Sequence, residues 1–278
     1  MVDNNIKATV REHYANIVRE GGSCCGPAPA RGGCCGEAPV ESEVSRRIGY
    51  SEQELGAVPQ GSNLGLGCGN PLAFAALKQG DVIVDLGSGA GFDCFLAARQ
   101  VGDSGRVIGV DMTPEMVDRA RHNAAEGGYS NVEFRLGEIE NLPVADGSAD
   151  MVISNCVINL STDKPRVFRE ALRVLKPGGR LMVSDLVLAK PLPESVRRSA
   201  EAYAGCIAGA MLKHDYLAAI GEAGFTEVEV MAEAVYPIGA SSPDASELAV
   251  LTADGIPFED LRAAAESVIS VKVSGRKP

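Results

Sequence analysis

Histidine and positive charge are both scarce in this sequence of 278 residues. The three histidines, His13, His122 and His214, fall outside the loops expected at the carboxyl edge of a sheet. A mechanism that begins with proton abstraction therefore has no strong histidine candidate. Lys and Arg number 26 against 37 Asp and Glu, which gives a net charge of −11. Because most of such a surface repels a polyanionic backbone, we expect no nucleic acid among the partners.

A long apolar run is also missing. No stretch approaches the roughly 20 apolar residues of a membrane-spanning helix, and the first residues, MVDNNIKATVREHY, have no signal-peptide pattern. We therefore expect no membrane partner and a cytoplasmic location, where cysteines stay reduced. The eight cysteines are too few for a disulfide-dense miniature fold. Thiol chemistry or metal binding is the better interpretation of them.

Four of the cysteines lie in a segment that has no core-forming composition. Residues 21–39 are almost entirely Gly, Pro, Ala and Cys, which is typical of a linker, and they contain CCG twice. The thiols of Cys24, Cys25, Cys34 and Cys35 are candidate ligands for a soft metal ion, although their spacing is not the CxxC pairing of common zinc sites. A tail that collects thiophilic ions and an insertion without function both stay open.

From residue 72 onward, helical and strand patterns alternate regularly. Strands are expected at 81–87, 106–111, 132–137, 149–155 and 179–188, and helices at 72–79, 92–101, 114–128 and 164–175. Elements of these lengths predict an α/β fold with a doubly wound, mostly parallel, Rossmann-like sheet and right-handed crossovers. With 45% hydrophobic residues, the chain has enough apolar surface for one such core with extensions.

The extensions divide the chain into three predicted parts. Residues 1–45 hold an amphipathic helix, marked by Ile6, Val10, Tyr14 and Ile17, and the Cys-rich segment. Residues 46–190 form the α/β core. Residues 191–278 form a helical insertion and a C-terminal region, for which we expect antiparallel edge strands at 224–235 and 268–276.

A glycine-rich loop, DLGSGAGFD at residues 85–93, follows the first expected strand and opens a helix. Its glycines allow a tight turn and a close backbone approach to a ligand at the helix N-terminus. The spacing is GxGxG rather than GxGxxG, and Asp85 and Asp93 would repel a phosphate but suit a ligand with a cationic centre. Asp111 ends the next strand, 20 residues beyond Gly91, where a carboxylate accepts hydrogen bonds from ribose hydroxyls. The ligand is therefore predicted to contain a nucleoside.

Two further segments complete the predicted cofactor site. Residues 137–140 follow the third strand and offer a carboxylate and a backbone amide to an adenine edge. The side chain of Asn155 either hydrogen-bonds the cofactor or fixes the neighbouring loop. The candidate cofactor-binding residues are Asp85, Gly87, Ser88, Gly89, Gly91, Asp93, Asp111, Met112, Glu138, Ile139 and Asn155.

The ordered set DLGSGAG, VD and GEIENLP resembles the class I S-adenosylmethionine-dependent methyltransferases across residues 72–190. The resemblance implies S-adenosylmethionine as the cofactor and a methyltransferase core. Transfer of a methyl group from a sulfonium requires a lone pair held in line behind the methyl carbon. Asp163 and Asp185 remain possible bases, which keeps an oxygen or carbon acceptor open.

Three cysteines point instead to a soft acceptor. Cys68 lies in the glycine-rich segment 61–71, Cys156 ends the fourth strand and Cys206 lies in the helical insertion. Three sulfurs that meet above the cofactor would hold a pyramidal trivalent arsenic with its lone pair directed outward. By contrast, Cys94 shares a helical face with apolar residues and is interpreted as core.

The segments IGYSEQELGAVPQGSNLGLGCGNP, SNCVINLSTDK and AYAGCIAGA closely resemble the arsenite S-adenosylmethionine methyltransferases over most of residues 45–230. The resemblance implies that Cys68, Cys156 and Cys206 bind arsenic and carry the catalysis. It implies methylation of free or glutathione-bound trivalent arsenic as a detoxification, with thioredoxin or glutathione as the reductant. The number of methyl groups and the role of the CCG units stay open.

Two other hypotheses compete with this one. A C- or O-methyltransferase of a small metabolite, such as a quinone precursor, would share the cofactor loop entirely. A non-enzymatic module that sequesters metal ions would use the thiols alone. The intact loop from Asp85 to Asp93 counts against the non-enzymatic module, which would not need it.

Overall fold

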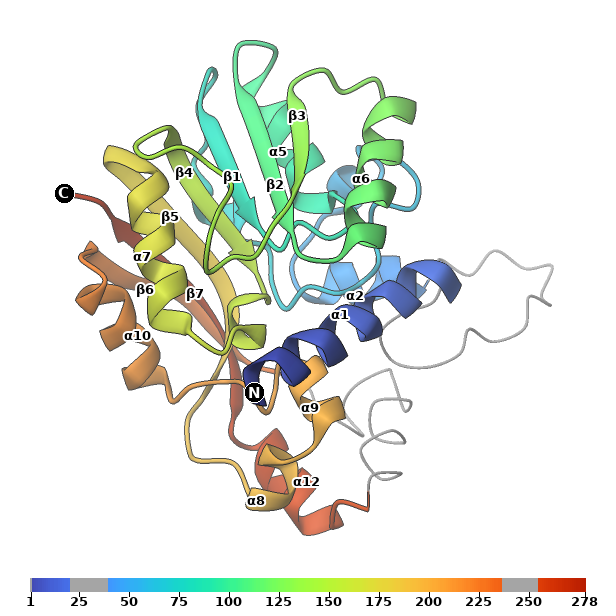
Figure 1. Cartoon of the computed structure of the whole chain (residues 1–278), viewed down its shortest axis with the longest axis vertical. Coiled ribbons are helices and arrows are strands. Elements are labelled where there is room, and N and C mark those ends of the chain that lie inside the picture. Colours follow the sequence, from blue (N-terminus) through green and yellow to red (C-terminus); the bar gives the residue numbers. More distant parts are fainter. Residues whose placement is uncertain (1, 21–39, 237–254) are drawn as a thin grey trace.

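A seven-stranded sheet runs through the part of the chain that the computed structural model describes, namely residues 2–20, 40–236 and 255–278 (Figure 1). The strand order is β3-β2-β1-β4-β5-β7-β6. The strands are β1 Val82–Leu86, β2 Arg106–Asp111, β3 Val132–Leu136, β4 Ala149–Asn155, β5 Leu175–Leu188, β6 Thr226–Val235 and β7 Val268–Arg276. The first five are parallel, and β7 is antiparallel to both β5 and β6.

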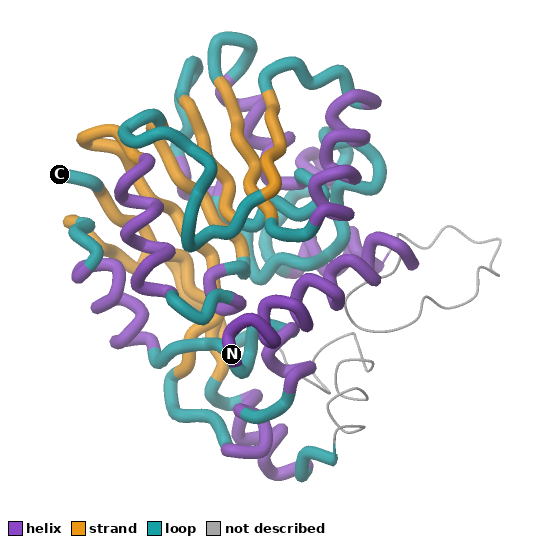
Figure 2. The backbone as a smooth tube through the Cα atoms, viewed as in Figure 1, coloured by secondary structure: helices purple, strands orange, loops and turns teal. Residues whose placement is uncertain are grey.

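Helices cover both faces of this sheet (Figure 2). The helices are α1 Val2–Glu20, α2 Val40–Arg47, α3 Glu52–Leu55, α4 Leu72–Ala75, α5 Phe92–Val101, α6 Pro114–Glu126, the 3-10 turn η1 Ile158–Leu160, α7 Lys164–Val174, α8 Glu194–Arg197, α9 Ala200–Ala204, α10 Lys213–Glu222 and α12 Phe258–Ala265. None of the helices in the described ranges combines the length and apolarity of a membrane span.

Two apolar clusters explain why the central strands read as nearly continuous hydrophobic runs. One cluster packs α7 and α10 against the sheet, with Phe168 and Tyr216 in edge contact at a centroid distance of 5.4 Å. The other packs α5 and α6 against the opposite face, around the fully buried Phe95. Strands covered on both faces need apolar side chains in both directions. The alternation of elements therefore predicts the α/β class correctly.

The three main differences from the pattern in the sequence concern α4, β5 and β7. Helix α4 ends at Ala75, earlier than expected, because Ala76 takes a left-handed backbone conformation with a φ of 46°. Strand β5 begins at Leu175 rather than at residue 179. The two late antiparallel strands are present, but only β6 lies at the edge, since β7 inserts between β5 and β6. The proposed division into three parts stays a prediction.

The sheet changes direction between β1 and β4. The chain moves outward to β2 and β3 on one side of this pair and to β5 on the other. In open α/β sheets, the carboxyl ends of the strands at such a switch point leave a crevice for ligands. Here those ends are Leu86 and Asn155, and α1 crosses this edge in contact with α6 and α9 (Figure 1).

Candidate active site

A pocket of about 1070 Å³, including its solvent-open part, lies at this edge between the glycine-rich loop and α1. Gly91 and Glu138 are absent from its lining. The other nine predicted cofactor residues all line it: Asp85, Gly87, Ser88, Gly89, Asp93, Asp111, Met112, Ile139 and Asn155.

The glycine-rich loop brings its backbone to the pocket. Gly87 has a φ of 67°, and a Cβ there would lie 2.3 Å from Cγ2 of Val157. Only glycine fits both the conformation and the space. Next to it, the hydroxyl of Ser88 is buried without a hydrogen-bond partner in the described residues. A buried polar group that lacks a partner and lines a pocket suits a bound polar ligand.

Three carboxylates give the pocket a negative lining. Asp111 is fixed by two backbone amides, since its Oδ2 accepts from Gly89 N at 2.9 Å and its Oδ1 from Thr113 N at 2.8 Å. Burial raises the pKa of Asp93 to about 6, and burial together with the charge of Asp93 raises the pKa of Asp85 well above its ordinary value. A cationic ligand would offset this cost of holding carboxylates close together.

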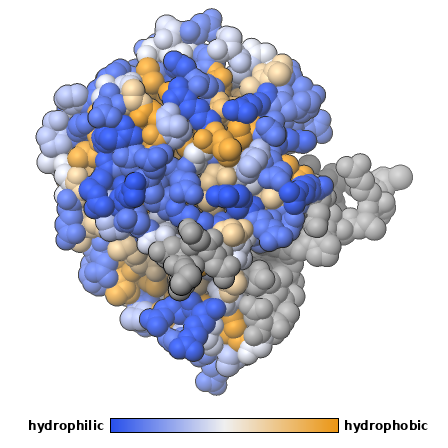
Figure 3. Space-filling model, viewed as in Figure 1, coloured by the Kyte–Doolittle hydropathy of each residue, from blue (hydrophilic) through white to orange (hydrophobic). Residues whose placement is uncertain are grey.

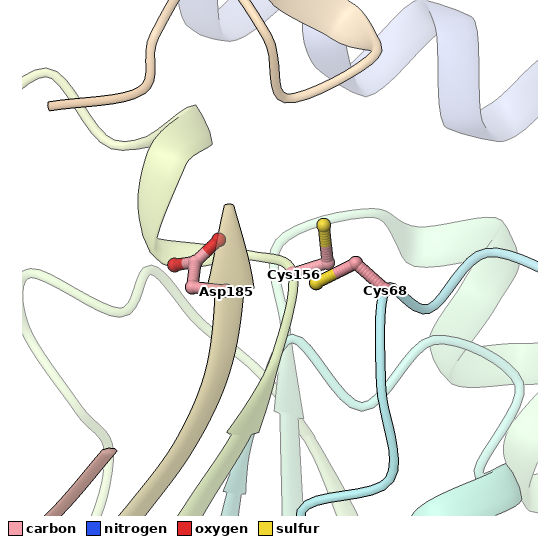
Figure 4. A group of neighbouring side chains, drawn as sticks. All are labelled: Cys68, Cys156 and Asp185. Carbon is pink, nitrogen blue, oxygen red and sulfur yellow. The ribbon is translucent and has the colours of Figure 1, made fainter. Parts of the chain in front are cut away.

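The structure brings the thiols of Cys68 and Cys156 together beside this pocket. Their sulfurs and one carboxylate oxygen of Asp185 all lie within 4.8 Å of one another (Figure 4). The thiol of Cys206 donates to the backbone oxygen of Cys156 at 2.9 Å. Three segments far apart in the sequence thus deliver their cysteines to one place. The CCG cysteines Cys24, Cys25, Cys34 and Cys35 lie outside the described residues.

These thiols are held in an apolar setting. All three belong to one buried cluster that includes Val10 of α1 and Leu186 of β5. Burial raises the pKa of Cys68, and hydrogen bonds with Cys206 and Cys68 raise the pKa of Cys156 well above the ordinary thiol value. Cys68 and Cys156 are therefore protonated at neutral pH.

Two of the three cysteines have a left-handed backbone. Cys156 has a φ of 58° and Cys206 has a φ of 64°. For a residue other than glycine, this conformation costs about 1–2 kcal/mol. The amide of Cys156 nevertheless keeps a hydrogen bond to Ser184 O at 2.8 Å. Such strain persists where the surrounding structure enforces it, and it is frequent at functional sites.

The loop that carries Cys68 is fixed from both sides. The backbone amide of Cys68 donates to Oδ1 of Asn155 at 3.1 Å, and the backbone carbonyl of Cys68 accepts from Ser270 Oγ at 2.8 Å. A Cβ on Gly69 would lie 2.0 Å from Oγ of Ser184. The amide of Asn155 therefore holds the neighbouring loop, one of the two roles open to it from the sequence.

Of the two aspartates considered as bases, only Asp185 lies at the site. Its carboxylate accepts from Leu186 N, Asn159 Nδ2 and Tyr216 OH, and burial raises its pKa to about 7. Asp163 instead caps the N-terminus of α7, where it accepts from Arg166 N at 3.1 Å.

The carboxylate that reaches the pocket after β3 is that of Glu140 rather than Glu138. Glu138 lies at the surface in an ion pair with Lys7 at 2.8 Å. Glu140 is buried, lines the pocket, and accepts from Ser161 Oγ at 2.7 Å. The adjacent position, Ile139, lines the pocket as the sequence pattern predicts.

The sequence analysis assigns no role to two residues at the site, although the first of them lies in the segment IGYSEQELG. Tyr50 is buried with its hydroxyl 2.6 Å from Oδ1 of Asp93, and Lys7 of α1 lines the pocket. Tyr50 directly precedes Ser51, the N-cap of α3. A lone aromatic before a capped helix is a weak signal, and only the path of the chain shows that it faces the cofactor loop.

Comparisons with known proteins agree with this geometry. A methyltransferase domain family matches residues 77–224. An arsenite methyltransferase from Halobacterium salinarum is 51% identical over 224 residues, covering 80% of this chain and 57% of that relative. The structure of an arsenic (III) S-adenosylmethionine methyltransferase from Chlamydomonas reinhardtii is 32% identical with a TM-score of 0.62, covering 86% of this chain and 74% of that one. The chain belongs to the arsenite methyltransferase family.

Membership of the arsenite methyltransferase family confirms the resemblance seen in the sequence, and the sheet confirms the α/β class. The chain spans 57% of the length of the halobacterial arsenite methyltransferase. A ubiquinone/menaquinone biosynthesis C-methyltransferase from Enterobacter sp. (strain 638) is 34% identical over 130 residues, covering 46% of this chain and 51% of that relative. This shorter match is the pattern expected when two proteins have only the core fold in common.

Proposed function

We propose that this protein transfers methyl groups from S-adenosylmethionine to trivalent arsenic bound by Cys68, Cys156 and Cys206, giving methylated arsenicals. One observation carries the proposal: three buried thiols from distant segments meet beside an acidic pocket at the switch point of the sheet. Thiolates select soft centres, and trivalent arsenic in a three-sulfur site keeps a lone pair for the transfer.

The residues of the pocket fit S-adenosylmethionine. The carboxylate of Asp111 would bind the ribose hydroxyls, and the amide of Ile139 with the carboxylate of Glu140 would bind the adenine edge. Asp85 and Asp93 suit a positively charged ligand. The hydroxyl of Ser88, which has no hydrogen-bond partner among the described residues, would form a hydrogen bond with the cofactor. When bound, this cofactor supplies a methyl group activated by a sulfonium charge.

The thiols would take arsenic out of water. Each exchange replaces an As–OH bond by an As–S bond, and the thiol proton leaves with the hydroxide as water. The exchange therefore needs no net deprotonation, which suits thiols with raised pKa values such as Cys156. Val10 and Tyr14 of α1 line the pocket and exclude solvent from the place of transfer.

A reductant belongs to the same proposal. Arsenic that donates its lone pair to a methyl cation rises from the trivalent to the pentavalent state. Two electrons are then needed before it can donate again, and thiols that supply them end as a disulfide. We propose thioredoxin or glutathione as the source, since both regenerate protein thiols by exchange.

A second candidate is methylation of carbon or oxygen in a small metabolite. It is favoured by the similarity to the quinone C-methyltransferase and by the buried carboxylate of Asp185 at the site. That carboxylate already accepts three hydrogen bonds from the protein. The thiols, which this second function would not use, are the reason to prefer arsenic.

The two functions are separated by product analysis. The purified protein would be incubated with labelled S-adenosylmethionine, arsenite and a thiol reductant. Chromatography coupled to elemental mass spectrometry would then identify the arsenic species. The proposal expects label in methylated arsenic, and consumption of cofactor only with a phenolic quinone precursor would replace it by the second function.

A further inference from the structure

Tyr50 is a buried side chain whose role the proposed chemistry leaves open. It is 4% exposed, and its ring packs against Phe92 with a centroid distance of 4.8 Å. Its hydroxyl donates to Oδ1 of Asp93 at 2.6 Å and accepts from Nδ2 of Asn155 at 2.9 Å. One hydroxyl thus joins a carboxylate of the cofactor pocket to the amide next to Cys156.

The amide of Asn155 has more acceptors than hydrogens. Its Nδ2 carries two hydrogens but lies within hydrogen-bond distance of three acceptors: Tyr50 OH at 2.9 Å, Gly69 O at 2.8 Å and Asp93 Oδ2 at 3.0 Å. Its Oδ1 accepts from the amide of Cys68. The same side chain therefore serves the Cys68 loop and the carboxylate of Asp93, which compete for it.

The backbone of the Cys68 loop packs closely against Asn155. A Cβ on Gly67 would lie 2.6 Å from Nδ2 of Asn155, so the loop backbone lies directly against this amide. Burial raises the pKa of Asp93 to about 6, so this carboxylate is mostly charged at neutral pH and is a strong acceptor. Without another donor, Asp93 would draw the amide hydrogens away from Gly69 O.

We propose that Tyr50 is a positioning residue for Cys68. By donating to Asp93, its hydroxyl leaves the Asn155 amide to hold the Cys68 loop, so that the thiol is in place for arsenic before the cofactor pocket is filled. The arsenic part of this inference rests on the proposed function, whereas the placement of Cys68 does not.

The test compares Tyr50→Phe with Tyr129→Phe. Tyr129 is a matched control, because its ring also packs on a phenylalanine, Phe95, while its hydroxyl donates to Ala57 O at 3.3 Å. In the empty protein, Tyr50→Phe should weaken arsenite binding about tenfold, measured by equilibrium dialysis, since a hydrogen bond to a charged group is lost. Tyr129→Phe should bind arsenite as the parent does.

Cofactor analogues separate positioning from a loss of structure. S-Adenosylhomocysteine carries an ammonium group that can satisfy Asp93, and it should restore arsenite binding by Tyr50→Phe to within about twofold of the parent. Methylthioadenosine lacks that group and should not. Restoration by neither compound, or equal binding by Tyr50→Phe and the parent, would overturn the proposal.

Two further measurements do not depend on cofactor binding, and the second does not depend on arsenic either. The double variant Tyr50→Phe, Asp93→Asn removes the competing charge and should regain the arsenite affinity that Tyr50→Phe lost. Alkylation followed by peptide mapping should show Cys68 reacting several-fold faster in Tyr50→Phe, with Cys94 unchanged. If the parent binds no arsenite, the proposed function fails, and unchanged Cys68 alkylation would reject the role of Tyr50.

Discussion

Cys156 is the residue on which the proposed chemistry depends most. Its left-handed backbone turns the chain at the end of β4, and its thiol lies against those of Cys68 and Cys206. Serine fits the same space, but its oxygen is a poor ligand for a soft centre. Cys156→Ser should lower arsenic methylation at least about 100-fold and leave cofactor affinity within about twofold.

The matched control is the other buried cysteine of the core. Cys94 donates its thiol to Asp85 Oδ2 at 3.2 Å, a bond that serine can keep. Cys94→Ser should therefore retain methylation, measured as methylated arsenic by elemental mass spectrometry. Near-parent activity of Cys156→Ser would remove this cysteine from the mechanism.

The raised pKa of Asp185 predicts that the free energy of unfolding depends on pH. Burial raises its pKa from 3.8 to about 7 in the folded protein. The folded state then holds a proton that the unfolded state has released, so the contribution is full below about pH 4 and is lost as the pH rises through about 7. One such proton lowers the free energy of unfolding by up to about 1.4 kcal/mol per pH unit between these values.

Asp185→Asn keeps the shape but cannot titrate. Its free energy of unfolding, measured in urea at several pH values, should fall less steeply between pH 4 and 7 than that of the parent. An equal slope in Asp185→Asn would show that this carboxyl does not change its protonation across that range.

Whether a residue could be assigned to the site from the sequence depended on how specific its residue type and position are for a function. Cysteines at strand ends and glycines after a strand carry a specific signal, so the sequence alone predicts a site at Cys68, Cys156 and the loop from Asp85. Tyr50 and Lys7 carry no such signal, because tyrosine and lysine are common in many settings. Their place at the site follows only from the path of α1 and of the segment after α2.

At the level of elements, α1 closes the pocket by an ion pair. Lys7 pairs with Glu138 at 2.8 Å and with Glu140 at 3.2 Å, and its side chain is largely buried. Lys7→Met keeps the aliphatic stem but loses these pairs, which are worth about 1 kcal/mol. It should release S-adenosylhomocysteine roughly fivefold faster in stopped-flow displacement.

A second ion pair on the same helix provides the control. Arg19 pairs with Glu115 of α6 at the other end of α1, and neither residue lines the pocket. Arg19→Met should leave the release rate unchanged. If both variants release the ligand equally fast, the effect belongs to the docking of α1 as a whole and not to Lys7.

Elements were predictable where burial on both faces dictates their composition. The strands β1, β2 and β4 lie within one residue of their expected ends for this reason. Helix α4 and the start of β5 were placed less well, because the left-handed Ala76 and the residues Pro177-Gly178-Gly179 leave little periodic signal. The insertion of β7 between β5 and β6 depends on long-range pairing, which a local pattern does not encode.

For the whole molecule, the excess of negative charge bears on which arsenic species can approach. The net charge is −11, and the face shown in Figure 3 is mostly hydrophilic with scattered apolar atoms. Arsenous acid is uncharged at neutral pH and meets no repulsion, whereas the glutathione conjugate carries negative charges. Salt should therefore speed capture of the conjugate and leave capture of arsenous acid unchanged in rapid-mixing experiments.

The CCG segment lies outside the described residues, and its role stays a prediction from the sequence. Among the described residues, the lining of the pocket and the three thiols come from residues 7–14 and 45–206. Deleting residues 23–36 should thus leave turnover at saturating arsenite within about twofold, while turnover at low arsenite falls several-fold if these thiols collect the ion. Replacing Cys24, Cys25, Cys34 and Cys35 by serine should reproduce the deletion, because the effect requires sulfur and not chain length. Loss of turnover at saturation in either variant would instead make the segment part of the active site.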